Sequence, residues 1–158
     1  MKPPFAVIFD MDGVLVDSNP YHKTAIEIFL TKHRFSFTDE ELKQKVWGRM
    51  NRANVDFVFE YLKIGHFFSV VLDDSHVKEG KPNPEIYLKT AQAMGFLPSQ
   101  CIVFEDSLAG TTSAKNAGTK VIGVTTTHTQ EELQATTHLI IDDFTQLSVD
   151  DLVKLISL

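Results

Sequence analysis

Two aspartates stand directly after an apolar run near the start of the chain. Asp10 and Asp12 follow residues 5–9, and a spacing of two places both side chains on one side of an extended backbone. Gly13 comes next and permits a sharp turn that brings backbone amides close to a ligand. The segment can therefore present two carboxylates and a ligand-binding turn at the end of one strand.

A second acidic pair, Glu105 and Asp106, follows the apolar run 101–104 in the same manner. Ligands of open α/β sheets bind outside the carboxyl ends of the strands, so the two acidic pairs can face one site. Four carboxylates would repel one another unless a cation joined them, and oxygen ligands select a hard ion such as Mg²⁺. With a metal in place, one aspartate can attack phosphorus and form an aspartyl phosphate, while a second donates a proton to the leaving oxygen.

A lysine stands between the two acidic pairs in the sequence. Lys81 lies between Gly80 and Pro82, just before an expected helix start, and its charge can offset that of an attacking carboxylate and a phosphate. Taken singly, each residue has an ordinary alternative, because aspartates at strand ends cap turns and helices and loop lysines are solvated. The acidic pairs and the lysine together are hard to explain as independent turns, and they favour a phosphoryl-transfer site.

The elements that must position these residues can be read from short apolar runs and helical periodicity. Strands are expected at residues 5–9, 68–72, 101–104, 120–124 and 139–141. Helices are expected from Asn19 to about Lys32, from Thr38, over 54–63, from Asn83 to Gly95, over 107–117, from about Gln130 and from Ser148. Unbroken apolar runs are typical of strands buried on both faces, so the pattern predicts an α/β fold with a mostly parallel sheet between helices.

The composition is that of a folded domain, with 158 residues, 43% hydrophobic and 23% charged. A net charge of −6 without a basic stripe argues against a nucleic-acid partner, and no apolar run approaches the ~20 residues that span a membrane. Because the amino terminus has no signal-type segment, we expect a cytoplasmic protein. The single cysteine, Cys101, opens an apolar run and is expected in the core.

Three segments together resemble signature motifs of the haloacid dehalogenase (HAD) superfamily, with the closest match to its β-phosphoglucomutase-like and sugar-phosphate phosphatase branch. They are residues 9–18, 81–85 and 103–107. The resemblance implies a three-layer, Rossmann-like HAD core with a reduced helical cap. It also implies Asp10 as nucleophile and Asp12 as general acid/base.

The resemblance further implies roles for the lysine and for a metal. Lys81 would be the charge-balancing lysine, and Mg²⁺ would be the cofactor. Glu105 and Asp106 would lie on the metal side, and the ion would also contact Asp10 and the backbone carbonyl of Asp12.

The resemblance extends to the segment that leads from the core into the cap. His22 lies where such proteins leave the core and is a candidate for substrate contact, although a histidine on a helix surface is the alternative. Arg49 and Arg52 lie in a segment that resembles a phosphate-gripping cap loop, although solvated arginines are the alternative. We therefore expect residues 1–18 and 53–158 to form the core and residues 19–52 to be a remnant of the cap.

The chain departs from the family pattern at Arg52/Ala53, where a block of residues is expected to be missing. Branch members carry a four-helix cap and then a core strand ending in a serine or threonine that holds the transferring phosphate. A sheet cannot leave buried backbone groups unpaired, so it is expected to close up, to recruit another chain's strand, or to come from a sequence that omits residues. The protein is accordingly expected to be a monomer or a strand-exchanged oligomer, with Ser18, Ser75 and Ser107 as candidate substitutes for the lost hydroxyl.

Three functions fit these features. The favoured one is Mg²⁺-dependent phosphoryl transfer through an aspartyl phosphate, ending in hydrolysis of a small phosphorylated metabolite such as a sugar phosphate. A β-phosphoglucomutase-type phosphosugar mutase shares the first half of that reaction, and a catalytically impaired binding or structural protein would keep the carboxylates without productive phosphate positioning. A response-regulator receiver is disfavoured because its acidic pair and phosphorylated aspartate lie on different strands, whereas Asp10 and Asp12 share one loop.

Overall fold

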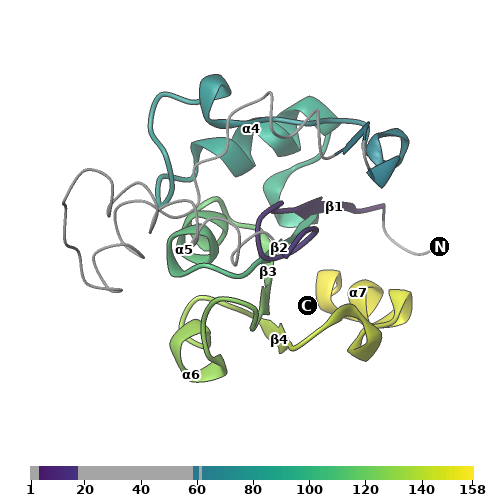
Figure 1. Cartoon of the computed structure of the whole chain (residues 1–158), viewed down its shortest axis with the longest axis vertical. Helices are drawn as coiled ribbons and strands as arrows, with labels where there is room; N and C mark the ends of the chain where they lie inside the picture. The colour runs from purple at the N-terminus through teal and green to yellow at the C-terminus, as the bar shows by residue number, and fades with distance from the viewer. Residues whose placement is uncertain (1–3, 18–58, 61) are drawn as a thin grey trace, which may run out of the picture.

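The computed structural model describes residues 4–17, 59–60 and 62–158 of the chain (Figure 1). Its strands form one parallel sheet in the order β1-β2-β3-β4. The strands are β1 Ala6–Phe9, β2 Cys101–Glu105, β3 Lys120–Val124 and β4 Leu139–Ile141. Four of the five predicted strands are therefore confirmed.

The α-helices from α4 onward begin close to the positions that local side-chain chemistry predicts. They are α4 Glu85–Met94, α5 Leu108–Asn116, α6 Gln130–Leu133 and α7 Val149–Ile156, with short 3₁₀ helices at Gly65–Phe67, Asp74–His76, Pro98–Gln100 and Phe144–Gln146. The side chain of Ser107 accepts the N–H of Gly110 at the start of α5. Gly95 ends α4 in the left-handed conformation, with φ 77°.

Helices cover both faces of the sheet, which makes the molecule three-layered. One apolar cluster joins the strands to α4 and α5 and contains Ile8, Val103 and Tyr87. The other joins the strands to α7 and contains Phe104 and Leu155. Figure 1 shows the strands between α5 and α7. The predicted Rossmann-like α/β fold is therefore confirmed, as is a buried Cys101, which opens β2 with no exposed surface.

The prediction of a strand over residues 68–72 is wrong. This segment belongs to no ladder, and β1 is therefore an edge strand within the described part of the chain. Val70 and Leu72 of the segment line the same cavity of about 160 Å³ as Val7 and Phe9 of β1. Apolar residues predict burial, but a ladder also needs a neighbouring backbone at about 4.8 Å, and a cavity lies beside β1 instead.

Part of the predicted architecture lies outside the described residues. This applies to the cap remnant 19–52 and to the Arg52/Ala53 seam, which stay predictions together with the oligomeric state. Of the helix predicted over 54–63, residues 59, 60, 62 and 63 are described; the first three are helical, whereas Lys63 is a turn residue with φ 56°. Among the described helices, none has the length and apolar character that a membrane span requires.

Candidate active site

The first acidic pair lies in a tight loop at the carboxyl end of β1. The N–H of Asp10 still belongs to the sheet, donating to the carbonyl of Phe104 over 3.0 Å. The loop then closes on itself, because the N–H groups of Leu15 and Val16 both donate to the carbonyl of Met11 over 3.0 Å. This geometry holds the Asp10 side chain at the edge where the parallel strands end.

Gly13 is required in this loop for two separate reasons. Its φ of 74° lies in the left-handed region, which a residue with a Cβ rarely adopts. A Cβ at this position would also lie 1.9 Å from Oδ2 of Asp106. The predicted sharp turn is confirmed, and its glycine also makes room for the second acidic pair.

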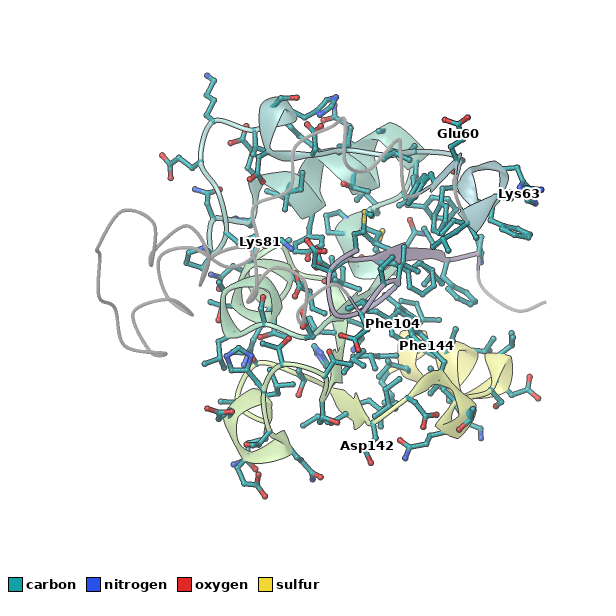
Figure 2. All side chains as sticks on the ribbon, viewed as in Figure 1. Glu60, Lys63, Lys81, Phe104, Asp142 and Phe144 are labelled. Atoms are coloured by element: carbon teal, nitrogen blue, oxygen red, sulfur yellow. The ribbon has the colours of Figure 1, made fainter. Side chains whose placement is uncertain are left out.

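Lys81 joins the two acidic pairs. Its Nζ donates to Oδ1 of Asp10 over 2.7 Å and also to Oε1 of Glu105. Figure 2 shows Lys81 on one side of the β1 ribbon, toward the middle of the molecule, and Glu60 and Lys63 on the other side. The ion pairs therefore connect a loop residue to carboxylates from two neighbouring strands.

Glu105 is fully buried and both its oxygens are engaged by protein donors. The hydroxyl of Tyr87 donates to Oε1 over 2.6 Å. Oε2 accepts the N–H groups of Asp106 and Ser107, at 3.1 and 3.2 Å, and the hydroxyl of Ser107 at 3.0 Å. Gly110 leaves the space for this carboxylate, because a Cβ there would lie 1.9 Å from Oε1. This geometry fixes Glu105 as the anchor of Lys81.

The site contains more acidic groups than basic groups. Burial, followed by the charge of Glu105, raises the pKa of Asp10 to about 7. Burial raises the pKa of Asp106 to about 6. Burial would also raise the pKa of Glu105, but Lys81 and the hydrogen bonds hold it below its usual value. Burial would lower the pKa of Lys81, yet Asp10 and Glu105 hold it well above the usual value, so it remains a cation.

A hard cation fits this arrangement. Asp10, Glu105 and Asp106 can each offer one carboxylate oxygen such that the three oxygens lie within 4.8 Å of one another. The donor set contains oxygen only, which suits Mg²⁺, and a positive ion would offset the burial and the mutual repulsion that raise the pKa values of Asp10 and Asp106. Asp12, the fourth predicted ligand, lies half-buried in the β1 loop, and the role of its carbonyl stays a prediction.

The predicted substrate-facing residues divide between described and undescribed parts of the chain. Asp10, Asp12 and Lys81 line the cavity beside β1, so the structure brings the three predicted catalytic residues to one opening. His22, Arg49 and Arg52 lie outside the described residues, as does Ser18.

The two described serine candidates for the lost hydroxyl already have protein partners. The Ser75 hydroxyl donates to Oδ1 of Asp73 over 2.6 Å. The Ser107 hydroxyl contacts Glu105 and caps α5. Neither hydroxyl is therefore available without giving up a contact that it makes in this structure.

A family model for haloacid dehalogenase-like hydrolases matches residues 39–124, more than half of the chain. The chain belongs to this family. The resemblance noted from the sequence is thereby confirmed, and the match includes Lys81 and the acidic pair at the end of β2.

Individual HAD proteins agree with this assignment. The fructose-1-phosphate phosphatase YqaB of Escherichia coli (strain K12) is 39% identical over 72 residues, which cover 46% of this chain and 38% of that protein. A phosphorylated carbohydrates phosphatase of Thermotoga maritima is 26% identical over 175 residues, covering 72% of this chain and 81% of its own length. The β-phosphoglucomutase of Clostridium difficile has the same fold, with a TM-score of 0.78, 20% identity and 96% of each chain covered.

The chain covers different shares of the length of its curated relatives. Seven of them match over between 24% and 38% of their own sequence. The alignment with the Thermotoga maritima phosphatase spans 175 residues, more than the 158 of this chain, so residues of that relative have no counterpart here. This agrees with the expected block of missing residues, whose position at Arg52/Ala53 and whose origin stay predictions.

Sequence reasoning missed four residues of the site: Tyr87, Thr126, Thr127 and His128. Tyr87 reaches Glu105 from the buried face of α4, where an aromatic residue in the sequence indicates core packing and nothing more. The other three follow β3 after Thr125, much as the acidic pairs lie at the ends of β1 and β2. Polar residues at the end of a strand could therefore have pointed to these three residues, as they pointed to the two acidic pairs.

Proposed function

We propose that this chain catalyses Mg²⁺-dependent phosphoryl transfer through an aspartyl phosphate and hydrolyses a small phosphorylated metabolite such as a sugar phosphate. The observation that carries the proposal is the surroundings of Asp10, whose carboxylate accepts a hydrogen bond from Lys81 and can bring one oxygen within 4.8 Å of oxygens of Glu105 and Asp106. The names of two relatives, a fructose-1-phosphate phosphatase and a phosphorylated carbohydrates phosphatase, support the substrate class.

Asp10 is the proposed nucleophile and Asp12 the proposed general acid/base. The Asp10 carboxylate attacks phosphorus, the bond from phosphorus to the substrate oxygen breaks, and Asp12 donates a proton to that oxygen. Water then attacks phosphorus while Asp12 takes a proton from it, and inorganic phosphate leaves with Asp10 restored. Mg²⁺, when bound, supplies positive charge to the phosphoryl oxygens.

Electrostatics assigns the remaining roles. Lys81 stays charged beside Asp10 and offsets negative charge on the attacking carboxylate and on the phosphate. Asp106, Asp10 and the carbonyl of Asp12 are the proposed metal contacts, and Glu105 completes the metal side while it anchors Lys81. A cation would also ionise Asp10, whose pKa of about 7 otherwise leaves it half-protonated at neutral pH.

The substrate's remaining groups are proposed to meet His22, Arg49 and Arg52, on the family resemblance alone. The same first half-reaction would serve a phosphosugar mutase, in which a sugar hydroxyl takes the place of water. A catalytically impaired protein is the second alternative. It is supported by β1, which no further strand pairs with among the described residues, on the side where the cavity lies.

Phosphate release tests the proposal. Purified protein is incubated with para-nitrophenyl phosphate and with a panel of sugar phosphates, with and without Mg²⁺, beside the Asp10→Asn variant. Mg²⁺-dependent release that is lost in Asp10→Asn, together with a phosphate adduct of the wild type on acid-quenched mass spectra, is the expected result. Release that survives Asp10→Asn would remove Asp10 as nucleophile, and Mg²⁺ binding without release would favour the impaired protein.

A further inference from the structure

Three consecutive residues in the loop after β3 contact Asp106. The hydroxyl of Thr127 donates to Oδ2 of Asp106, and the hydroxyl of Thr126 lies 3.3 Å from the same oxygen. Nδ1 of His128 lies 3.0 Å from the backbone carbonyl of Asp106. Because a carbonyl oxygen only accepts, this histidine nitrogen carries the proton and donates.

The hydroxyl groups of Thr126 and Thr127 donate to different acceptors. The Thr126 hydroxyl also lies 2.5 Å from the carbonyl of Gly13, and its single proton belongs to this shorter contact. Thr127 is therefore the principal side-chain donor to Asp106, while Thr126 ties the β3 loop to the β1 loop. Loops from three adjacent strands meet at one carboxylate.

These contacts leave the two oxygens of Asp106 in different environments. Both threonine contacts fall on Oδ2, and within the described part of the chain no protein donor reaches Oδ1. The residue is only 4% exposed, and it belongs to the group that can bring three carboxylate oxygens within 4.8 Å. A hydrogen bond that holds one oxygen of a buried carboxylate fixes the direction of the other.

We propose that Thr127 is a positioning residue that, with Thr126 and His128 behind it, keeps Oδ1 of Asp106 available to a divalent cation and so sets the affinity of the site. The inference rests on the metal site of the proposed function. It adds to that site a group of residues that touch neither substrate nor metal. Outer-shell partners of this kind typically change metal affinity by 10–100-fold when they are removed.

Direct metal binding by the metal-free protein tests the proposal without relying on turnover. Mg²⁺ affinity is measured by titration calorimetry, and Mn²⁺ affinity by electron paramagnetic resonance, for wild type, Thr127→Val and Thr127→Ser. Thr127→Val keeps the side-chain volume and removes the donor, so it should bind at least about 10-fold more weakly. Thr127→Ser retains the hydroxyl and should stay within about 3-fold of wild type, which lies below that range.

Thr125→Val is the matched control. The Thr125 hydroxyl donates to Asp142 over 2.6 Å in an exposed pair, so its loss changes the same loop without touching Asp106. Its metal affinity should equal that of wild type. Melting of the metal-free variants should change by only a few degrees. If Thr127→Val does not fold, Thr127→Ala is measured and judged by the same criterion.

The outcomes separate this proposal from the proposed function. Wild-type affinity in Thr127→Val, or an equal loss in Thr125→Val, overturns the positioning role while the metal site stands. A wild-type protein that binds neither Mg²⁺ nor Mn²⁺ overturns the metal site itself, and the positioning role with it.

Discussion

The hydroxyl of Tyr87 donates a 2.6 Å hydrogen bond to the same Glu105 oxygen that accepts from Lys81. Tyr87 is 3% exposed and lies on α4, so a polar contact ties this helix to the end of β2 within an otherwise apolar layer. Burial and the charge of Glu105 raise the pKa of Tyr87 well above its usual value, and the hydroxyl therefore keeps its proton and donates it. The hydrogen bond stabilises the Glu105 carboxylate, whose burial among apolar groups alone would be unfavourable.

Tyr87→Phe should therefore lower the free energy of unfolding by about 1.5–3 kcal/mol, the range for a hydrogen bond to a charged group. Urea unfolding followed by circular dichroism measures this change in the free energy of unfolding. Thr90→Val on the same helix is the comparison, because its hydroxyl donates to the neutral carbonyl of Ile86 over 2.7 Å and should contribute less. A cost for Tyr87→Phe no larger than that of Thr90→Val would contradict the assigned role.

The stability of the metal-free protein should depend on pH through Asp10. Its pKa in the folded state, about 7, lies above the usual value of 3.8, so the folded state holds the proton more tightly. This contribution to stability is complete below about pH 4 and is lost as pH rises through 7. Asp10→Asn stays neutral, so wild type should lose stability relative to this variant between pH 4 and 7.

Mg²⁺ should reverse that trend, because the cation favours the ionised carboxylate. Chemical unfolding of both proteins across pH 4–8, with and without Mg²⁺, provides the comparison. A difference between wild type and Asp10→Asn that stays constant over this range without metal would show that the folded pKa of Asp10 is not raised.

Gly13→Ala should disturb both folding and metal binding. The left-handed backbone costs roughly 1–2 kcal/mol for a residue with a Cβ, and the new methyl group would also displace the Asp106 carboxylate. Gly118→Ala is a matched control, because Gly118 has φ 81° but no atom within 4 Å of a built Cβ. Unfolding and Mg²⁺ titration should show the backbone cost in both variants and a loss of metal affinity in Gly13→Ala alone. Equal metal affinities would refute the contact with Asp106.

Gly110→Ala should destabilise the protein although it replaces glycine within a helix. In an exposed helix the change typically gains about 1 kcal/mol. Here the methyl group would lie within 2.2 Å of the Glu105 carboxylate, which is fully buried and held by five hydrogen bonds from protein donors. Thermal melting should therefore show a lower transition temperature than wild type. An increase would mean that Glu105 moves aside without cost.

Elements whose boundaries depend on neighbouring residues could be predicted from the sequence. Ser107 and Gly118 bound α5 through contacts made within a few residues, and β3 matches its apolar run over 120–124. The approach of Asp10 to Asp106 was also predictable, because parallel strands carry their carboxyl ends to one edge of the sheet.

Features that depend on distant partners could not be predicted. The run 68–72 has the composition of a strand, but pairing depends on whether a backbone lies beside it, and composition does not contain that information. The engagement of Oε1 of Glu105 is of the same kind, since its donors come from residues 81 and 87. Whether position 110 of α5 has room for a side chain likewise depends on Glu105, which belongs to β2.

The edge position of β1 has a consequence for the behaviour of the protein at high concentration. Because the N–H of Asp10 points to β2, the alternation of a strand directs the N–H and carbonyl groups of Val7 and Phe9 to the opposite side, where no described strand meets them. An unpaired edge beside apolar side chains is a template for aggregation. Whatever covers these few backbone groups therefore controls the colloidal stability of the protein as well as its fold.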